Sequence, residues 1–467
     1  MLGLSLIGPA CGHSPTGSTP SPTARPNFVV IIADDMAYGL LGPARRFPFV
    51  PLPNLQGLTA RGVLFDNAFV TTSLCSPSRA TLLTGLYAHT HGVMVNENVE
   101  LSPGIATYPQ ILQQAAYETA FVGKWHMDSR TDAPRPGFDY WLSFRGQGVY
   151  QDPLFNENGH AVQRYGYITD LLTEYAVDWL RQPRTKPFLL ILSHKAPHNP
   201  ALPAERHAGA LTEAALPQPM SFVDSYEGKP AWERRYARCG GGAAAFAACP
   251  DPQPDRLPPW PWNGHDAPRL DYLRTLMALD DSVGTVLSAL DGLGVARSTY
   301  VVFLSDNGLL LGEHRLGDKR LAYEESLRIP LVIGGADLTG RRVSATALNL
   351  DLAPTVVELA GLGVPSPMQG RSLAKLLRGG PAPARESFLY EYRRESFLPV
   401  VPDIQAVRTA SRKYVTYPGD SAEVELYDLV TDPNEMANLA GRPEWAAAEA
   451  QLRQELERLL TQTGAPR

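Results

Sequence analysis

The sequence predicts an α/β fold: a doubly wound sheet with helices on both faces, followed by a smaller C-terminal subdomain of antiparallel strands. Apolar, β-branched runs such as NFVVIIA (residues 27–33) show no alternation of apolar and polar residues, which indicates strands buried on both faces. Helical patterns alternate with these runs, an order typical of parallel βα units. From about residue 386 the runs are shorter and separated by turns, which favours antiparallel pairing.

The individual elements follow from this rhythm. The first strand should lead into a helix within residues 52–62. Further helices and strands are expected, in pairs, at residues 107–117 and 119–125, at 167–182 and 187–198, and at 273–294 and 298–308. The C-terminal strands are expected at residues 387–392, 404–417 and 424–433, before a terminal helix that starts near residue 443.

The composition is that of a globular chain. Of the 467 residues, 44% are hydrophobic and 19% are charged. The net charge of -6 and the lack of clustered Lys and Arg argue against a nucleic-acid partner, because phosphate binding needs a basic surface. No apolar run reaches the roughly 18 to 20 residues that a membrane-spanning helix needs, so no transmembrane span is expected.

The N-terminus differs from the rest of the chain. A short apolar piece is followed by small residues around Cys11 and by a Ser/Thr/Pro/Gly tract that cannot bury enough surface to fold. This pattern resembles a bacterial lipoprotein signal and predicts a leader and tether (residues 1–25), a lipid anchor at Cys11, and export to the periplasm or cell surface. A poorly ordered leader with an incidental cysteine is the alternative. The large domain is expected at residues 26–385 and the C-terminal subdomain at residues 386–467.

The other cysteines raise a separate question. Cys239 and Cys249 flank a Gly/Ala-rich loop flexible enough to bring them together, and a disulfide there fits an exported protein. Two unpaired buried thiols are the alternative. Either way Cys75 has no comparable structural partner, so its position at the start of a helix-like run needs another explanation.

Polar side chains gather where the predicted strands end. Parallel strands place their carboxyl ends at one edge of the sheet, where ligands bind in such folds. The residues that follow four of the strands are Asp34 and Asp35, Lys124 and His126, His194 and His198, and Asp306 and Asn307. Buried carboxylates need a compensating cation or hydrogen bonds, and the hard oxygen donors of Asp34, Asp35, Asp306 and Asn307 select Ca²⁺ or Mg²⁺ over Zn²⁺. A helix N-cap is the alternative for any single Asp.

Cationic and imidazole residues accompany these carboxylates. Arg79, Lys124 and Lys319 could neutralise an anionic substrate. His126 and His198 could transfer a proton near neutral pH. Taken singly, Lys319 could be a solvated loop charge and His198 a structural histidine in a Pro-rich turn. A substrate with several anionic oxygens would explain the whole set.

The segment CSPSRATLLTG, which begins at Cys75, resembles the signature of the type I sulfatases, whose Cys-x-Pro-x-Arg cysteine is oxidised to Cα-formylglycine. NFVVIIADDM, GKWHM, HKAPHNP, LSDNGLLLGEH, GDKR and ELYDLVTDPNEMANLA resemble further family segments in the expected order, so the resemblance covers nearly the whole chain. It implies an alkaline-phosphatase-like fold with a doubly wound mixed sheet. It also implies a sulfuric ester hydrolase in which the hydrated aldehyde attacks sulfur.

The same resemblance implies a role for each site residue. The metal ligands would be the formylglycine from Cys75 together with Asp34, Asp35, Asp306 and Asn307. Arg79 would hold the aldehyde hydrate, while Lys124 and Lys319 would bind sulfate oxygens. His126 would take a proton from the diol to release sulfate, and His198 would protonate the leaving alkoxide. A formylglycine-generating enzyme would be a partner during maturation.

Two segments bear on the substrate. GDKRLAYEESLRIPLVI and YEGKPAWERRY look most like the group that removes 6-O-sulfate from N-acetylglucosamine, which implies sulfated sugars or aryl sulfates as substrates. A phosphonate or phosphate ester hydrolase of the same superfamily and a non-catalytic relative that binds sulfated glycans remain alternatives. The non-catalytic relative would be expected to lack Cys75, the metal carboxylates or the histidines, and this sequence has them all.

Overall fold

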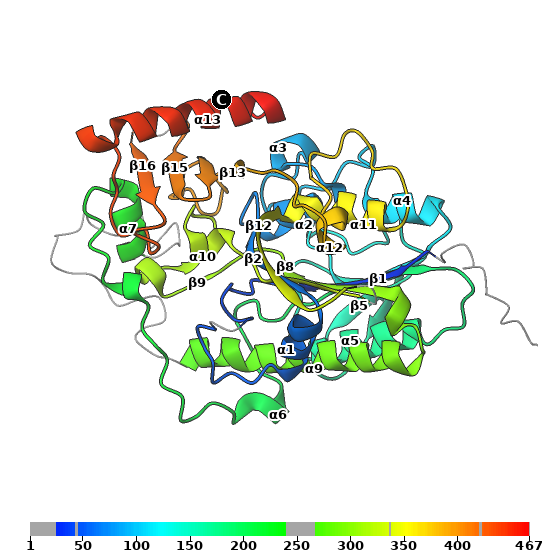
Figure 1. Ribbon diagram of the computed structural model, residues 1–467. Coiled ribbons are helices and arrows are strands. Elements are labelled where there is room, and N and C mark those ends of the chain that lie inside the picture. The colour runs from blue at the N-terminus through cyan, green and yellow to red at the C-terminus, as the bar shows by residue number, and fades with distance from the viewer. Residues whose placement is uncertain (1–24, 43–44, 240–266, 336–337, 420–422, 467) are drawn as a thin grey trace, which may run out of the picture.

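A ten-stranded mixed sheet forms the centre of the protein (Figure 1). The computed structural model describes residues 25–42, 45–239, 267–335, 338–419 and 423–466. Across the sheet the strand order is β12-β2-β11-β8-β1-β7-β3-β4-β5-β6. The strands are β1 (Asn27–Ala33), β2 (Val63–Phe69), β3 (Glu118–Lys124), β4 (Tyr140–Phe144), β5 (Leu154–Glu157), β6 (His160–Gln163), β7 (Phe188–Ser193), β8 (Thr299–Ser305), β11 (Leu331–Gly334) and β12 (Arg341–Leu348).

The middle of this sheet is parallel. Strands β8, β1, β7, β3 and β4 are neighbours that all run in the same direction. Ile32 of β1 pairs with Ser193 of β7 on one side and with Leu304 of β8 on the other, so these strands end level with one another. Strand β11 is antiparallel to both of its neighbours, and β5 and β6 are antiparallel at the other end.

Helices cover both faces of the sheet (Figure 1). One face carries α1 (Pro53–Arg61), α5 (Ile168–Leu180) and α9 (Ala267–Gly292), and the other carries α2 (Cys75–Thr84), α4 (Tyr108–Gln114), α11 (Leu352–Leu359) and α12 (Ala374–Leu377). Successive strand residues point to opposite faces. Val29 and Ile31 therefore join the apolar cluster with α1, α5 and α9, while Val30 joins the cluster on the other face. All seven residues of β1 are buried, as the unbroken apolar run predicts.

A second, four-stranded antiparallel sheet follows near the C-terminus, and α13 (Ala446–Thr463) packs across it (Figure 1). Its strands are β13 (Ser387–Tyr392), β14 (Ile404–Thr409), β15 (Arg412–Thr416) and β16 (Val424–Asp428). A third apolar cluster joins Phe388 and Tyr390 of β13 to Phe69 and Leu74 of the large part, so the two sheets share buried contacts. The shorter elements are α3 (Ala88–His91), α6 (Glu205–Ala208), α7 (Ala231–Cys239), α10 (Glu324–Leu327), β9 (Leu310–Leu311) and β10 (Gly317–Asp318).

The predicted fold class is confirmed, both in the doubly wound mixed sheet and in the antiparallel C-terminal sheet. The expected helices and strands are present, whereas six strands of the large sheet were not individually predicted: β2, β4, β5, β6, β11 and β12. Cys11 and Cys249 lie outside the described residues, so the lipid anchor and the disulfide remain predictions. No helix in the described ranges has the length and apolar character required to cross a membrane.

Candidate active site

Four neighbouring strands deliver polar side chains to one edge of the sheet. Asp34 and Asp35 follow β1, Lys124 ends β3, and Asp306 follows β8. The fourth strand, β7, leads into the turn that carries His198. Because the four strands are parallel and end level with one another, these side chains converge as the sequence predicts.

Cys75 reaches this edge as the first residue of α2, and its side chain is fully buried. Two serines of the same motif hold the start of the helix in place. The Ser76 hydroxyl donates to the carbonyl oxygen of His126, and the Ser78 hydroxyl donates to the carbonyl oxygen of Asp306. The N-terminus of α2 is thereby fastened to the ends of β3 and β8, and the positive end of the helix dipole lies near Cys75.

One turn into α2, the Arg79 guanidinium lies between two carboxylates. Its Nε donates to Asp306 Oδ2 over 3.0 Å, and one terminal nitrogen lies 3.4 Å from Asp34 Oδ1. Burial would raise the pKa of Asp34, but Lys124, His198 and Arg79 together hold it well below its usual value. Burial instead dominates at Asp306 and raises its pKa to about 6, because Asp34 and Asp35 oppose the effect of Arg79.

Lys319 connects the carboxylates to Cys75. Its ammonium pairs with Asp35 and also donates to Cys75 Sγ over 3.1 Å. Burial disfavours a charged lysine, but Asp35, Cys75, Asp318 and Asp34 together outweigh the effect of burial and raise the pKa of Lys319 well above its usual value. Burial raises the pKa of the Cys75 thiol to about 12. The thiol is therefore protonated at neutral pH and is a weak nucleophile as it stands.

Both predicted histidines line the same centre. His198 Nε2 lies 3.5 Å from Asp35 Oδ2, and its Nδ1 lies 2.5 Å from the carbonyl oxygen of Asn199. Burial, and then the Lys124 charge, lower the pKa of His198 to about 4. The same two causes hold the pKa of His126 well below its usual value, and none of the described residues forms a hydrogen bond with Nδ1 of His126. Both imidazoles are therefore neutral near pH 7.

The centre contains a group of side chains that could hold a metal ion. One ligand atom from each of Asp34, Asp35, Cys75 and His198 lies within 4.8 Å of the others. Among the described residues, none donates a hydrogen bond to Asn307 Oδ1 or to Asp34 Oδ1, although Asp34 Oδ1 has the 3.4 Å ion-pair contact with Arg79. Buried oxygens that lack a hydrogen bond fit a hard cation such as Ca²⁺ or Mg²⁺.

The positions of Asp306 and Asn307 differ in detail from the predicted ligand set. Asp306 lies beside this group, with Oδ2 facing Arg79 and Oδ1 accepting the backbone N–H groups of Asp35 and Asn307. The Asn307 amide nitrogen donates to Asp35 Oδ1 over 2.7 Å. In this arrangement protein donors satisfy both carboxylate oxygens of Asp306 and the Oδ1 atom of Asp35.

Two residues at this centre were not singled out from the sequence. Gln147 Oε1 accepts a hydrogen bond of 2.5 Å from Lys124 Nζ. Lys195, between His194 and His198, is only 3% exposed. Its place in the segment HKAPH could have indicated it, because it lies two residues after the end of β7. Gln147 lies in a loop with no such signal.

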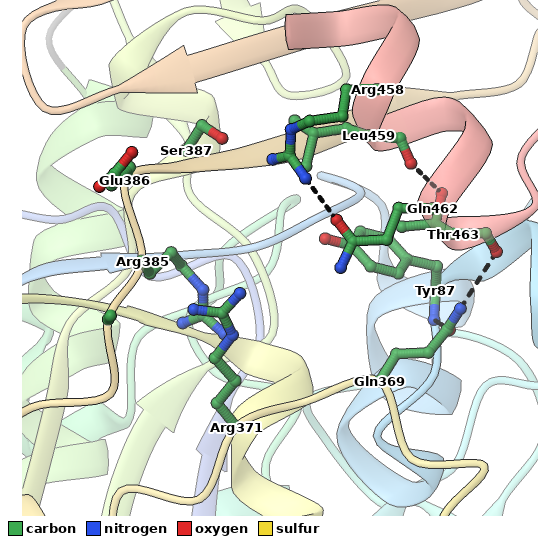
Figure 2. A pocket seen from close by; sticks show the side chains of 11 residues that line it. Tyr87, Gln369, Arg371, Arg385, Glu386, Ser387, Arg458, Leu459, Gln462 and Thr463 are labelled. Carbon is green, nitrogen blue, oxygen red and sulfur yellow. Dashed lines mark hydrogen bonds between the residues drawn. The ribbon is translucent and has the colours of Figure 1, made fainter.

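A separate cavity of about 430 Å³ lies between α13, the approach to β13 and the loop with Gln369 (Figure 2). Tyr87, just past the end of α2, lines it, so this cavity is at the opposite end of the helix from Cys75. Two of its arginines form ion pairs with neighbouring carboxylates, Arg385 with Asp351 and Arg458 with Glu455. None of the predicted catalytic residues lines it.

Comparisons with known proteins agree with this geometry. The sulfatase family model matches residues 26–362, and a model described as the C-terminal part of N-sulphoglucosamine sulphohydrolase matches residues 312–462. The chain is 32% identical to an N-acetylglucosamine-6-O-sulfatase of Bacteroides thetaiotaomicron, over 93% of this chain and 86% of that protein. It is 28% identical to the N-acetylglucosamine-6-sulfatase of Homo sapiens, over 90% and 81%.

A solved structure agrees as well. It is that of a protein in complex with its substrate D-glucosamine-2-N,6-O-disulfate, and it matches with a TM-score of 0.83 and 31% identity, over 94% of this chain and 98% of that one. Three findings lead to the same conclusion. They are a family model that covers most of the chain, a relative above 30% identity, and a converging set of buried carboxylates, cations and histidines. The chain belongs to the sulfatase family and is an enzyme that hydrolyses sulfate esters.

Proposed function

We propose that this enzyme removes 6-O-sulfate from N-acetylglucosamine-type sugars, using a formylglycine made from Cys75. The main observation in favour of a formylglycine nucleophile is that unmodified Cys75 is a fully buried thiol. Burial raises the pKa of this thiol to about 12. A thiol attacking sulfur would also form a thiosulfate-like adduct with no internal group to expel it. A hydrated aldehyde, –CH(OH)₂, has a second hydroxyl that does so.

Maturation must then precede folding. The Cys75 side chain has no exposed surface in the folded protein, and Ser76 and Ser78 on either side of Pro77 are hydrogen-bonded into the core. A formylglycine-generating enzyme that supplies the oxidant, breaks the carbon–sulfur bond of –CH₂SH and leaves –CHO would have to act on the unfolded CSPSR segment. The modified chain would then fold with the aldehyde next to Lys319.

The chemistry follows from the groups around residue 75. One hydroxyl oxygen of the hydrate attacks sulfur, and the bond between sulfur and the sugar oxygen breaks. Neutral His198 can accept the proton of the attacking hydroxyl and pass it to the leaving sugar oxygen, since its ligand nitrogen lies within 4.8 Å of Cys75 Sγ. His126 then takes the proton of the second hydroxyl, the carbon–oxygen bond to sulfate breaks, and the aldehyde re-forms. Water restores the hydrate.

The cations have complementary roles in this proposal. Arg79 would hold the hydrate, and Lys124 and Lys319 would bind the sulfate oxygens. Lys319 already contacts Cys75 Sγ, which occupies the place of the reacting oxygen atoms in the mature enzyme. Each of these cations is buried, so its attraction for a sulfate oxygen is weakly screened.

A Ca²⁺ or Mg²⁺ ion is part of the proposal. Its ligands would be Asp34, Asp35, Asp306 and Asn307 together with residue 75, and the Oδ1 atoms of Asp34 and Asn307, which accept no hydrogen bond from the described residues, support this. Its chemical contribution when bound is to polarise a sulfate oxygen and to favour loss of a proton from the hydrate. Without it, Lys124 and Lys319 neutralise the two carboxylates that follow β1.

The proposed substrate class rests on the relatives. Two of them are named for N-acetylglucosamine-6-sulfate chemistry, and a similar solved structure contains a 6-O-sulfated glucosamine as its substrate. We further propose that residues 1–25 are a leader and tether, with Cys11 lipidated for display at the periplasm or cell surface. The catalytic domain would span residues 26–385 and the C-terminal subdomain residues 386–467.

A positional screen tests the substrate. Mature enzyme should release sulfate from N-acetylglucosamine-6-sulfate much faster than from the 3-sulfate isomer or from N-sulfated glucosamine without a 6-sulfate. Sulfate release would be followed by ion chromatography, with Cys75→Ser protein as the blank. A clear preference for another position, or for a phosphonate ester, would contradict the proposal.

A further inference from the structure

Lys195 is the one cation of this centre that the mechanism does not use. It follows β7, only 3% of it is exposed, and its Nζ lies 4.9 Å from the centroid of the Tyr150 ring. Within the described ranges its ammonium makes no hydrogen bond and no ion pair. An ammonium in this state is costly, because it has lost most of its water without gaining an anion.

The other cations of the centre differ in this respect. Arg79 pairs with Asp306, Lys124 with Asp34, and Lys319 with Asp35. With Lys195 included, the four buried cations exceed the three carboxylates by one. The unpaired positive charge is therefore localised at Lys195, beside the carboxylates that would hold the metal.

The loop of residues 145–150 holds this arrangement in place. Gln147 contacts Lys124, and the Tyr150 hydroxyl donates to the carbonyl oxygen of His198 over 2.8 Å. Tyr150 also stacks on Tyr167, with ring centroids 5.7 Å apart. This loop gives Lys124 an amide oxygen and Lys195 a ring face as neutral partners. These two contacts orient the ammonium groups without adding a negative charge.

The protonation state of Lys195 is also that of a cation without an anionic partner. Burial, and then the nearby Lys124 charge, lower its pKa to about 8, so it remains mostly charged at pH 7. An anion placed against it would raise that pKa again and relieve the cost of burial. A buried side chain of this kind, in a centre that binds anions, points to an anionic group of the ligand.

We propose that Lys195 and Tyr150 form a subsite for a second anionic group of the substrate, next to the sulfate that is removed. This inference rests on the proposed function and refines it, since it selects sugars that carry two negative groups. The group would be a sulfamate or sulfate on the same sugar, or a carboxylate on the neighbouring sugar.

The test compares substrates with one and two anionic groups. Wild type, Lys195→Met and Lys195→Arg would be assayed on N-acetylglucosamine-6-sulfate, on glucosamine-N,6-disulfate and on a 6-sulfated disaccharide with a uronate. Lys195→Met should raise KM about 10-fold or more for at least one doubly charged substrate and less than about 3-fold for the singly charged one, with kcat nearly unchanged. Lys195→Arg should restore most of the loss, and the doubly charged substrate that is affected identifies the source of the second anion.

The controls separate binding from folding. Lys186→Met removes an exposed lysine just before the amino end of the same strand and should change no KM. Lys195→Met should melt at the same temperature as wild type or higher, because it removes an unpaired buried charge. A fall in melting temperature, an equal KM rise on all substrates, or no rise on any would overturn the proposal. If wild type hydrolyses none of these sugars, the proposed function fails instead, and calorimetric binding of glucosamine-N-sulfate to wild type and Lys195→Met still decides the subsite.

Discussion

At the scale of single residues, the surroundings assign different tasks to chemically similar groups. His126 and His198 are both neutral near pH 7, but only His198 belongs to the group whose ligand atoms lie within 4.8 Å of one another, together with Cys75. Asp35 lies 3.5 Å from its Nε2 and can stabilise the imidazolium that forms when a proton is in transit. These contacts favour His198 over His126 as the group that protonates the leaving sugar.

This assignment predicts a dependence on the leaving group. His198→Ala should lower kcat/KM by about 100-fold or more for a sugar 6-sulfate, whose alkoxide needs a proton. The loss should be below about 10-fold for 4-nitrophenyl sulfate, whose phenolate leaves unprotonated. His207→Ala, which removes a histidine paired with Asp281, serves as the control. Equal losses of kcat/KM on both substrates would indicate that His126, and not His198, protonates the leaving group.

At the scale of elements, the start of α2 determines where the nucleophile stands. The Ser78 hydroxyl donates to the Asp306 carbonyl and accepts from Asn349 Nδ2 over 2.9 Å, so it links the helix to β8 and to the segment before α11. At the other end of α2, Thr84 donates to the carbonyl oxygen of Ala80 over 2.8 Å. The two hydroxyls have similar partners, but only Ser78 lies near the reacting atoms.

Ser78→Ala and Thr84→Ala should therefore differ in activity and not in stability. Each substitution leaves a buried polar group without a partner and should lower the free energy of unfolding by about 1–3 kcal/mol. Ser78→Ala should also lower kcat by about 10-fold, because residue 75 and Asp306 lose their fixed separation. Urea denaturation and steady-state kinetics measure the two effects. A loss of kcat in both variants would mean that general loosening of α2 is responsible.

The elements also show what the sequence can predict. β1 was predictable because its seven residues are all apolar or small apart from Asn27, and all seven are buried. β11 was not, because it has only four residues and enters the sheet antiparallel, between β2 and β8. Its position depends on pairing with strands far away in the sequence, which a local pattern does not encode.

At the scale of the whole molecule, buried charges join the C-terminal sheet to the catalytic part. Glu324, five residues after Lys319, pairs with Arg408 of β14 and Lys413 of β15. Glu435 accepts the backbone N–H of Glu324 over 2.8 Å and pairs with Lys413. The C-terminal sheet thus helps to position the segment that carries Lys319.

Glu435 makes the stability of this junction depend on pH. Burial raises its pKa to about 7, and Lys413 offsets this only in part. The folded protein therefore binds a proton that the unfolded chain releases between about pH 4.5 and pH 7, so stability falls as pH rises through that range. The contribution is on the order of 1–3 kcal/mol.

Glu435→Gln should remove this dependence. Relative to wild type, the variant should be more stable at pH 8 than at pH 5, because only the ionised glutamate is penalised by burial. Chemical denaturation at the two pH values measures the difference, and Glu444→Gln, an exposed position, is the matched control. The same difference at both pH values would exclude Glu435 as the source.

The meeting of the site residues at one edge of the sheet could likewise be predicted only in part. The strand ends and the CSPSR motif located Asp34, Cys75, Lys124 and Asp306 at one edge, since parallel strands bring their carboxyl ends together. The contact of Gln147 with Lys124 was not predictable, because it depends on how a loop folds back over the sheet. The hydrogen bond from Arg79 to Asp306 was not predictable either, because it depends on the distance between α2 and β8.

The nature of residue 75 decides whether this molecule works as proposed. Active protein would be digested with trypsin, and the peptide GVLFDNAFVTTSLCSPSR would be examined by mass spectrometry while turnover is measured on the same preparations. An aldehyde at residue 75, in a fraction that scales with kcat, is the predicted result, and Cys75→Ala should fold but not turn over. Multiple turnover at the wild-type rate by Cys75→Ala, or by protein that carries only unmodified cysteine, would contradict the formylglycine mechanism.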